Sequence, residues 1–96
     1  MAIWRWVELP IRTESVEFVQ GLLAQHAPKV RAFPGCQALH LYAGEGPTFY
    51  SFSQWATSTD LETYRQSSLF RTFWEQLRPH FRAQPRAFSL TLLASY

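Results

Sequence analysis

The residues best suited to chemistry lie in two short, strand-like runs on either side of a turn that contains Gly and Pro. His40 is on the first run, and its imidazole titrates near neutral pH, so it can act as a general base. On the second run, the hydroxyls of Ser51 and Ser53 can orient a carbonyl or hydroxyl group, and the indole of Trp55 can stack on an aromatic ring. The pattern predicts a site that deprotonates a small aromatic molecule.

These residues also have structural interpretations, which the sequence leaves open. His40 can be a strand histidine hydrogen-bonded to Ser51 or to solvent, and both serines can be small wall residues. Trp55 can close the end of a cavity by packing. A nucleophilic Ser51–His40 pair is not expected, because the chain has neither a nucleophile-elbow pattern nor an evident orienting acid.

Further candidates lie in segments with helical spacing. Tyr64 and Trp74 can reach the same pocket, although their spacing also fits core packing. His26 and His80 are expected on the surfaces of helices. The histidines lack metal-ligand spacing such as H-x-x-x-H, so no metal site is predicted. Cys36 is the single cysteine, so no intrachain disulfide forms, and we expect a small buried hydrophobe there.

The distribution of apolar residues predicts the order of helices and strands. We expect a strand, a helix, two strands, two short helices and a strand over residues 3–9, 13–30, 36–43, 49–55, 57–64, 67–81 and 88–92. Pro28 predicts a kink or break in the first helix about one turn earlier. Thr57 and Asp60 resemble a capping box. This β-α-β-β-α-β order is that of the ferredoxin-like α+β fold, an antiparallel sheet with its helices on one face.

The register of the central hairpin decides which side chains share a face. A loop of about six residues pairs Tyr42 with Phe49. His40 then lies opposite Ser51. The expected helix-facing core consists of Leu39, Leu41, Tyr50 and Phe52. The expected cavity wall, on the other face, consists of Cys36, Ala38, His40, Tyr42, Phe49, Ser51, Ser53 and Trp55.

The composition suits a single domain over residues 1–96, with 47% hydrophobic residues. Four Trp, four Tyr and eight Phe are more aromatic surface than one small core readily absorbs, so some is expected at an interface or in a ligand pocket. The helix-free face of the sheet also needs cover. A second copy of the chain is the simplest cover, and we expect a homodimer. Either Trp4 and Trp6 or Arg5 can line the cavity from the first strand.

Charge and segment composition argue against several classes of protein. The net charge of +2 is not gathered in a basic stripe, and Arg71, Glu75 and Arg78 suit a solvated helix face. Nucleic acid is therefore not an expected partner. The apolar runs are shorter than the roughly 18 residues that a membrane helix needs. The first residues do not resemble a signal peptide, so the cytoplasm is the expected location.

A series of motifs runs in order along nearly the whole chain: Phe33-Pro34-Gly35-Cys36, residues 49–55 up to Trp55, then Thr57, Leu61, Tyr64 and residues 67–74. In these motifs the chain resembles the antibiotic biosynthesis monooxygenase domains of the dimeric α+β barrel superfamily. The resemblance implies oxygenation of a small aromatic or quinol-type substrate in a pocket between the sheet and helices of a homodimer. The substrate anion itself would donate an electron to O₂, while the protein supplies deprotonation, orientation and a dry cavity.

The resemblance carries over to individual residues unevenly. Trp55 matches the strand-ending Trp of the oxygenases, and His40 matches a pocket histidine on the preceding strand. Ser51 stands where the polyketide oxygenases have an Asn, and the chain has no Asn at all. Trp74 stands where the haem-degrading members have their iron-ligating His, and the first-strand Asn of those members is also missing. Haem is therefore not expected, and neither is any other cofactor.

The favoured interpretation is a cofactor-independent monooxygenase-like protein that uses O₂, with His40 as the base. The substrate-binding residues are expected to be Trp55, Ser51, Ser53, Tyr42, Phe49, Tyr64 and Trp74. The missing Asn favours an alternative, a non-catalytic dimer that binds a small ligand or stabilises an assembly. Isomerase or cyclase chemistry would need the same cavity and base.

Overall fold

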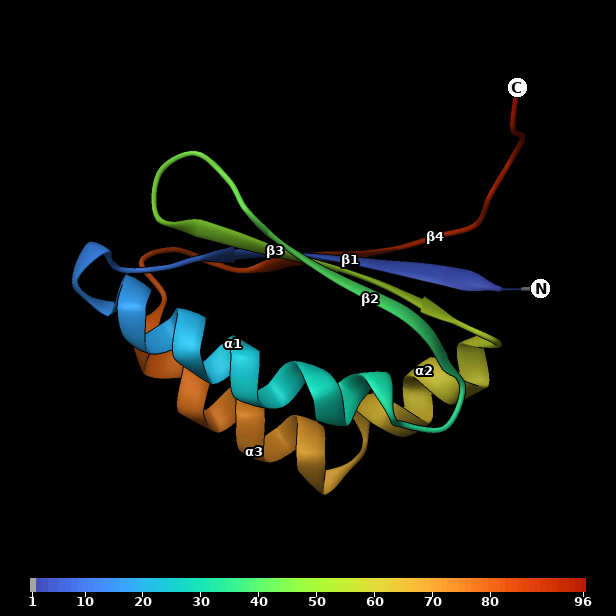
Figure 1. Cartoon of the computed structure of the whole chain (residues 1–96), viewed down its shortest axis with the longest axis horizontal. Helices are drawn as coiled ribbons and strands as arrows, with labels where there is room; N and C mark the ends of the chain where they lie inside the picture. Colours follow the sequence, from blue (N-terminus) through green and yellow to red (C-terminus); the bar gives the residue numbers. More distant parts are fainter. Residues whose placement is uncertain (1) are drawn as a thin grey trace.

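A four-stranded antiparallel sheet forms one layer of the molecule, and three helices cover one of its faces (Figure 1). The computed structural model describes residues 2–96. The strands are β1 (Ile3–Pro10), β2 (Cys36–Ala43), β3 (Thr48–Trp55) and β4 (Arg86–Leu90), in the order β2-β3-β1-β4. The helices are α1 (Val16–Arg31), α2 (Ser58–Arg65) and α3 (Ser68–Leu77), with single 3-10 turns at Thr13–Ser15 and Arg78–His80. This confirms the predicted ferredoxin-like α+β fold.

Local sequence signals account for where the helices begin. Thr57 caps α2, because its Oγ1 accepts a hydrogen bond from the backbone N–H of Asp60 at 3.1 Å. Ser67 caps α3 in the same way, accepting from the N–H of Phe70 at 3.2 Å. The break predicted about one turn before Pro28 does not occur, since α1 is a single helix from Val16 to Arg31. Pro28 is exposed and lies in the last turn, where water can satisfy the backbone carbonyl that loses its partner.

The predicted hairpin register is wrong by one residue. Tyr42 pairs with Tyr50, and His40 pairs with Phe52. A shift of one residue moves every side chain of a strand to the other face. The register of β2 also shifts between Cys36 and Ala38, as at a β-bulge. Cys36 and Ala38 therefore lie on opposite faces of the sheet, although two residues so spaced in a regular strand would share a face. The strand residues that face the helices are therefore Cys36, Leu39, Leu41, Phe49, Ser51, Ser53 and Trp55, with Arg5, Val7 and Leu9 beside them on β1.

Two apolar clusters hold the helices against the sheet at its two ends. One contains the buried residues Leu9, Ile11, Val19, Leu23, Phe49, Phe73 and Leu77. The other contains Val30, Cys36, Trp55, Leu61 and Tyr64. Cys36 is thus a small buried residue, as predicted, and burial raises the pKa of its thiol. The sheet and helix layers are tied at both ends, with room between them.

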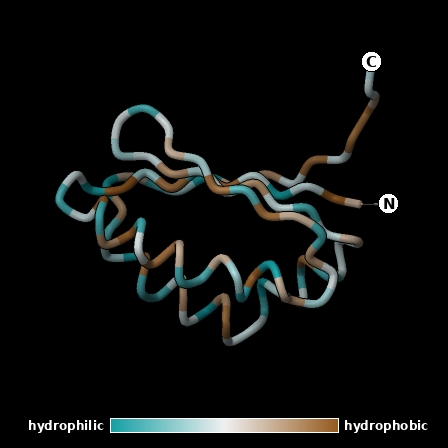
Figure 2. Tube along the Cα trace, in the orientation of Figure 1, coloured by the Kyte–Doolittle hydropathy of each residue, from teal (hydrophilic) through white to brown (hydrophobic). Residues whose placement is uncertain are grey.

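The last strand begins and ends two residues earlier than predicted, at Arg86–Leu90 instead of residues 88–92. It ends at Leu90, and the apolar segment beyond it leads away from the sheet (Figure 2). Leu92 was predicted to belong to this strand, but it lies outside it and is exposed, and Leu93 is 99% exposed. The apolar side chains of this segment are therefore left in solvent in the single chain.

The turn before β2 passes close to the first turn of α2 at Gly35, and a substitution at this residue tests that packing. Its φ is +89°, and a Cβ at this position would overlap the side chain of Asp60. We expect Gly35→Ala to lower the free energy of unfolding by about 1–3 kcal/mol. Gly21→Ala is the matched control, because a Cβ at Gly21 would meet nothing within 4 Å. This helix substitution should raise stability by about 0.5–1 kcal/mol.

Urea denaturation of both variants measures these differences. Equal effects of the two substitutions would contradict the described turn.

Candidate functional site

A cavity of about 390 Å³ lies between the sheet and the helices. Its floor is the helix-facing side of β1, β2 and β3, and its roof is formed by α1, α2 and α3. Apolar contributors include Val7, Leu23, Val30, Leu39, Leu61 and Phe70. The volume falls in the range of sites for small organic ligands, and a largely apolar wall with a few polar groups is typical of such sites.

His26 and Tyr64 form a hydrogen-bonded polar pair on the wall of this cavity. His26 lies on α1 and Tyr64 on α2, and the Nε2 atom of His26 is 3.0 Å from the Tyr64 hydroxyl oxygen. The imidazole stacks on the ring of Phe73, with 3.8 Å between ring centroids and an angle of 4° between planes. Tyr64 stacks in turn on Trp55 at 5.1 Å. Aromatic packing on both rings therefore holds the pair in one geometry.

Burial keeps both members of the pair uncharged. Desolvation, helped by the nearby charge of Lys29, lowers the pKa of His26 from 6.5 to about 4. Desolvation raises the pKa of Tyr64 well above its usual range. At neutral pH the site thus holds a neutral imidazole and a protonated phenol. A neutral imidazole has one donor and one acceptor nitrogen, so this pair can pass a proton along its hydrogen bond.

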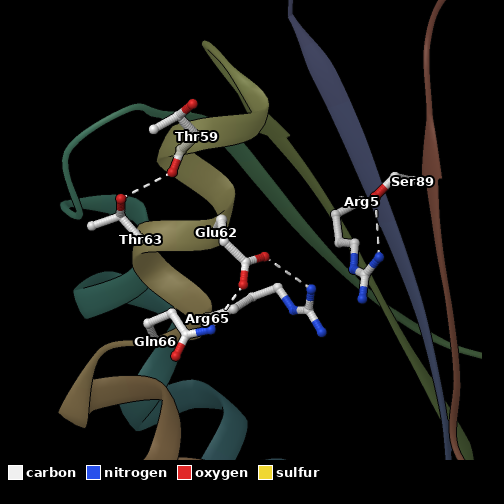
Figure 3. A network of polar contacts seen from close by, with 7 residues as sticks. All are labelled: Arg5, Thr59, Glu62, Thr63, Arg65, Gln66 and Ser89. Atoms are coloured by element: carbon white, nitrogen blue, oxygen red, sulfur yellow. Dashed lines mark hydrogen bonds and ion pairs between the residues drawn. The ribbon is translucent and has the colours of Figure 1, made fainter.

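A cationic group lies at another part of the cavity wall. Arg5 on β1 and Arg65 on α2 both line the cavity, and Figure 3 shows the Arg65 side chain extending from the helix toward Arg5. Arg5 donates a hydrogen bond to the hydroxyl of Ser89 at 3.1 Å. Arg65 pairs with Glu62 at 3.1 Å.

Four of the eight predicted site residues line the cavity: Ser51, Ser53, Tyr64 and Trp74. Two others lie in the core. Phe49 is packed among apolar residues, and Trp55 is 0% exposed. The Trp55 indole N–H donates to the Ser53 hydroxyl at 3.0 Å. Trp55 therefore positions Ser53 and Tyr64 from beneath the cavity wall.

His40 and Tyr42 lie on the opposite face of the sheet. This follows from their pairing with Phe52 and Tyr50, which stack on the outward-facing Trp4 and Trp6. Both residues were predicted on the helix-free face and they lie there, but the cavity lies on the helix side, so neither residue lines it. The predicted faces that are wrong are those of β3, because the hairpin closes on Ala43 and Phe49 rather than on Tyr42 and Phe49: Ser51 and Ser53 face the helices, whereas Tyr50 and Phe52 face away from them. The cavity lies between sheet and helices, as the family resemblance implied.

The sequence contained signals for the residues that were missed. His26 was expected at a helix surface, but it lies three residues after Leu23 and four before Val30, both buried on the same side of α1. Arg5 lies on the same face of β1 as Val7 and Leu9, and this face lines the cavity. The structure thus answers the open question of which first-strand residues line it. His80 is half-buried, with its Nδ1 atom 2.8 Å from the Ser15 hydroxyl.

Two searches of residues 2–96 gave negative results. No group of three or more His, Cys, Asp or Glu side chains in this range could hold a metal ion. No helix among these residues has the length and apolar character needed to cross a membrane.

Comparison with known proteins gives a family and a fold. A family model described as antibiotic biosynthesis monooxygenase matches residues 6–76. No curated protein gives a significant match. The solved structures that match include an antibiotic biosynthesis monooxygenase, with 18% identity and a TM-score of 0.89 over 96% of this chain and 99% of that one. Rv0793 of Mycobacterium tuberculosis has 18% identity and a TM-score of 0.90 over 99% and 98%. PA3566 of Pseudomonas aeruginosa has 19% identity and a TM-score of 0.86 over 97% and 95%.

The low pKa of His26 predicts how stability depends on pH. Between pH 6.5 and 4 the unfolded chain binds a proton at this residue that the folded protein does not bind. Stability should therefore fall as the pH drops through this range, by at most about 1.4 kcal/mol per pH unit from this one group. Solvent around the half-buried ring reduces the effect.

Chemical denaturation of the wild type and of His26→Gln at several pH values measures this contribution. Carboxylate contributions are common to both proteins and cancel in the difference. The difference in unfolding free energy between the two proteins should change between pH 6.5 and 4 and then level off. A difference that is constant with pH would show that His26 is solvated in the folded state.

Proposed function

The chain belongs to the antibiotic biosynthesis monooxygenase family, and we propose that it oxygenates a small aromatic or quinol-type substrate in the cavity between sheet and helices. The observation that carries the proposal is the hydrogen-bonded His26–Tyr64 pair on the wall of a mostly apolar cavity. The pair offers proton transfer at a half-buried position beside mostly apolar walls. Those are the needs of a reaction in which an ionised substrate reacts directly with O₂.

The His26–Tyr64 pair supports a proton relay. With the Tyr64 hydroxyl donating to Nε2 of His26, the Tyr64 oxygen is free to accept a proton from a substrate hydroxyl while its own proton passes to the imidazole. An imidazole with a pKa of about 4 is a weak base, so the negative charge left on the substrate needs stabilisation. The guanidinium of Arg5 on the same cavity wall supplies positive charge.

The oxygenation then needs electrons only from the substrate. The hydroxyl-bearing carbon and a ring C–H carbon para to it both become carbonyls: one oxygen atom of O₂ enters the product at the C–H carbon, and the other leaves as water with the hydrogens that the hydroxyl and the C–H lose. Aromatic side chains suit the flat substrate: Trp74 and Phe70 stack on each other at 5.7 Å on the roof of the cavity. The hydroxyls of Ser51 and Ser53 line the floor and can orient a substrate oxygen. The base role moves in this proposal from His40 to His26.

One specific observation favours a second candidate, ligand binding without turnover. Ser51 stands where the polyketide oxygenases have an Asn, and a hydroxyl gives fewer hydrogen bonds than an amide. The two candidates share the cavity and differ in whether O₂ is consumed.

We also propose that a second copy of the chain covers the helix-free face of the sheet. The aromatic face, as we call it, consists of Trp4, Trp6, Tyr42, Tyr50, Phe52 and Phe88. Its rings stack on one another, as Trp4 does on Phe52 at 4.6 Å. No helix covers it in the single chain (Figure 1). Tyr42 is 49% exposed and Phe88 45%. A contiguous exposed patch of large rings is typical of an interface.

Oxygen uptake tests the catalytic proposal. The purified protein should consume O₂ with members of a panel of hydroquinones and polyphenols, and labelled O₂ should leave one labelled atom in the product. His26→Gln and Tyr64→Phe should each lower the rate by about 100-fold, because the proton relay is lost. His40→Ala is the matched histidine control and should keep the rate, because His40 lies on the opposite face.

Binding of panel members without O₂ uptake would support ligand binding instead. Loss of activity in His40→Ala with retention in His26→Gln would contradict the proposed site.

Light scattering tests the covered aromatic face. The wild type should be a dimer at micromolar concentration, and Phe88→Lys should shift it to the monomer, since a buried unpaired charge at an interface is costly. The control is Phe18→Lys, on the helix side of the molecule, where Phe18 is 56% exposed. It should remain a dimer. A well-folded wild-type monomer would refute the interface.

A further inference from the structure

Of the three arginines that line the cavity, Arg65 pairs with Glu62 and Arg86 pairs with Glu8. Arg5 forms no ion pair within 4 Å among residues 2–96, and its one side-chain hydrogen bond goes to the neutral hydroxyl of Ser89. A guanidinium has five N–H donors, so most of its donors remain available. Partial burial lowers the pKa of Arg5, and repulsion from Arg65 lowers it further, whereas Glu62 acts in the opposite direction. Arg5 and Arg65 are thus close enough to repel each other.

The nearest acid is already used within its own helix. One carboxylate oxygen of Glu62 accepts from Arg65 at 3.1 Å, and the other accepts from Gln66 at 2.9 Å (Figure 3). The group of Arg5, Arg65 and Glu62 therefore carries a net charge of +1. Part of this excess lies in a half-buried side chain that faces an apolar cavity, where a charge without an ionic partner is costly.

We propose that Arg5 and Arg65 form an anion subsite, and that the natural ligand of the cavity is an aromatic molecule bearing a carboxylate. A planar carboxylate matches the fork of donors on a guanidinium. The apolar walls and the rings of Phe70 and Trp74 take the aromatic body. The carboxylate completes the charge balance of the subsite, while the His26–Tyr64 pair stays available for proton transfer. This inference rests on the proposed function and adds the class of substrate.

Matched ligands with and without charge test the subsite. Naphthoate and its uncharged counterpart naphthamide can be titrated into the protein and followed by tryptophan fluorescence, since Trp74 lines the cavity. We expect naphthoate to bind about tenfold more tightly than naphthamide, because a hydrogen-bonded charge adds to the same apolar contacts. Arg5→Gln should abolish the preference and leave naphthamide affinity unchanged.

Two further variants separate the charge effect from a structural one. Glu62→Gln removes the only acid of the group and should strengthen naphthoate binding several-fold. Arg71→Gln, at an exposed arginine on α3 outside the cavity, should change neither affinity. Arg5→Lys keeps the charge and should restore part of the preference. A loss of fold would lower the affinities for naphthoate and naphthamide together. A charge effect would instead lower naphthoate affinity in Arg5→Gln and raise it in Glu62→Gln.

Equal affinity of the wild type for naphthoate and naphthamide would overturn the anion subsite. A change of naphthoate affinity in the same direction in Arg5→Gln and Glu62→Gln would overturn it too. If neither ligand binds, the subsite is overturned as well. The proposed function is decided separately by O₂ uptake with neutral quinols, which does not depend on a carboxylate.

Discussion

The alternation of side chains along a strand is the constraint on which the whole molecule depends. On β1, Arg5 and Val7 face the helices and line the cavity, while Trp4 and Trp6 face the opposite side. The same central strand therefore builds the floor of the cavity and the middle of the aromatic face. A shift of register by one residue would exchange the two surfaces, so the residues that fix the register also decide where chemistry can occur.

The fold could be predicted from the sequence because its signals are local. Caps such as Thr57 and Ser67 act over three residues, and strand and helix periodicities repeat within single elements. The assignment of faces failed because it depends on features that span several elements. The closing pair of the hairpin decides which β3 side chains share a face with those of β2, and the irregularity between Cys36 and Ala38 moves Cys36 to the helix side. Neither the closing pair nor the irregularity can be predicted from the amino-acid composition of the two strands.

The candidate site was predictable in part for the same reason. Tyr64 and Trp74 were identified from residue type and helical spacing, and both line the cavity. Ser51 and Ser53 line it as well, although they were predicted on the helix-free face of the sheet. Arg5 could not be assigned, because alternation places it on one face of β1 with Val7 and Leu9 but does not say which face meets the helices. His26 was missed although its spacing was informative. A histidine in a helix is more often solvated, and only the facing Tyr64 and Phe73 reveal its role.

The position of β1 between the cavity and the aromatic face would have a thermodynamic consequence if both surfaces bind partners as proposed. Neighbouring residues on β1 face either the cavity or the aromatic face. A ligand that restricts the β1 backbone from the cavity side would therefore reduce the conformational entropy that the strand still loses when the aromatic face is covered. Any ligand that immobilises Arg5 would then favour self-association through Trp4 and Trp6, and self-association would favour the ligand by an equal free energy. Ligand binding in the cavity and dimerisation through the aromatic face would then be coupled through the flexibility of β1, without any change in the fold.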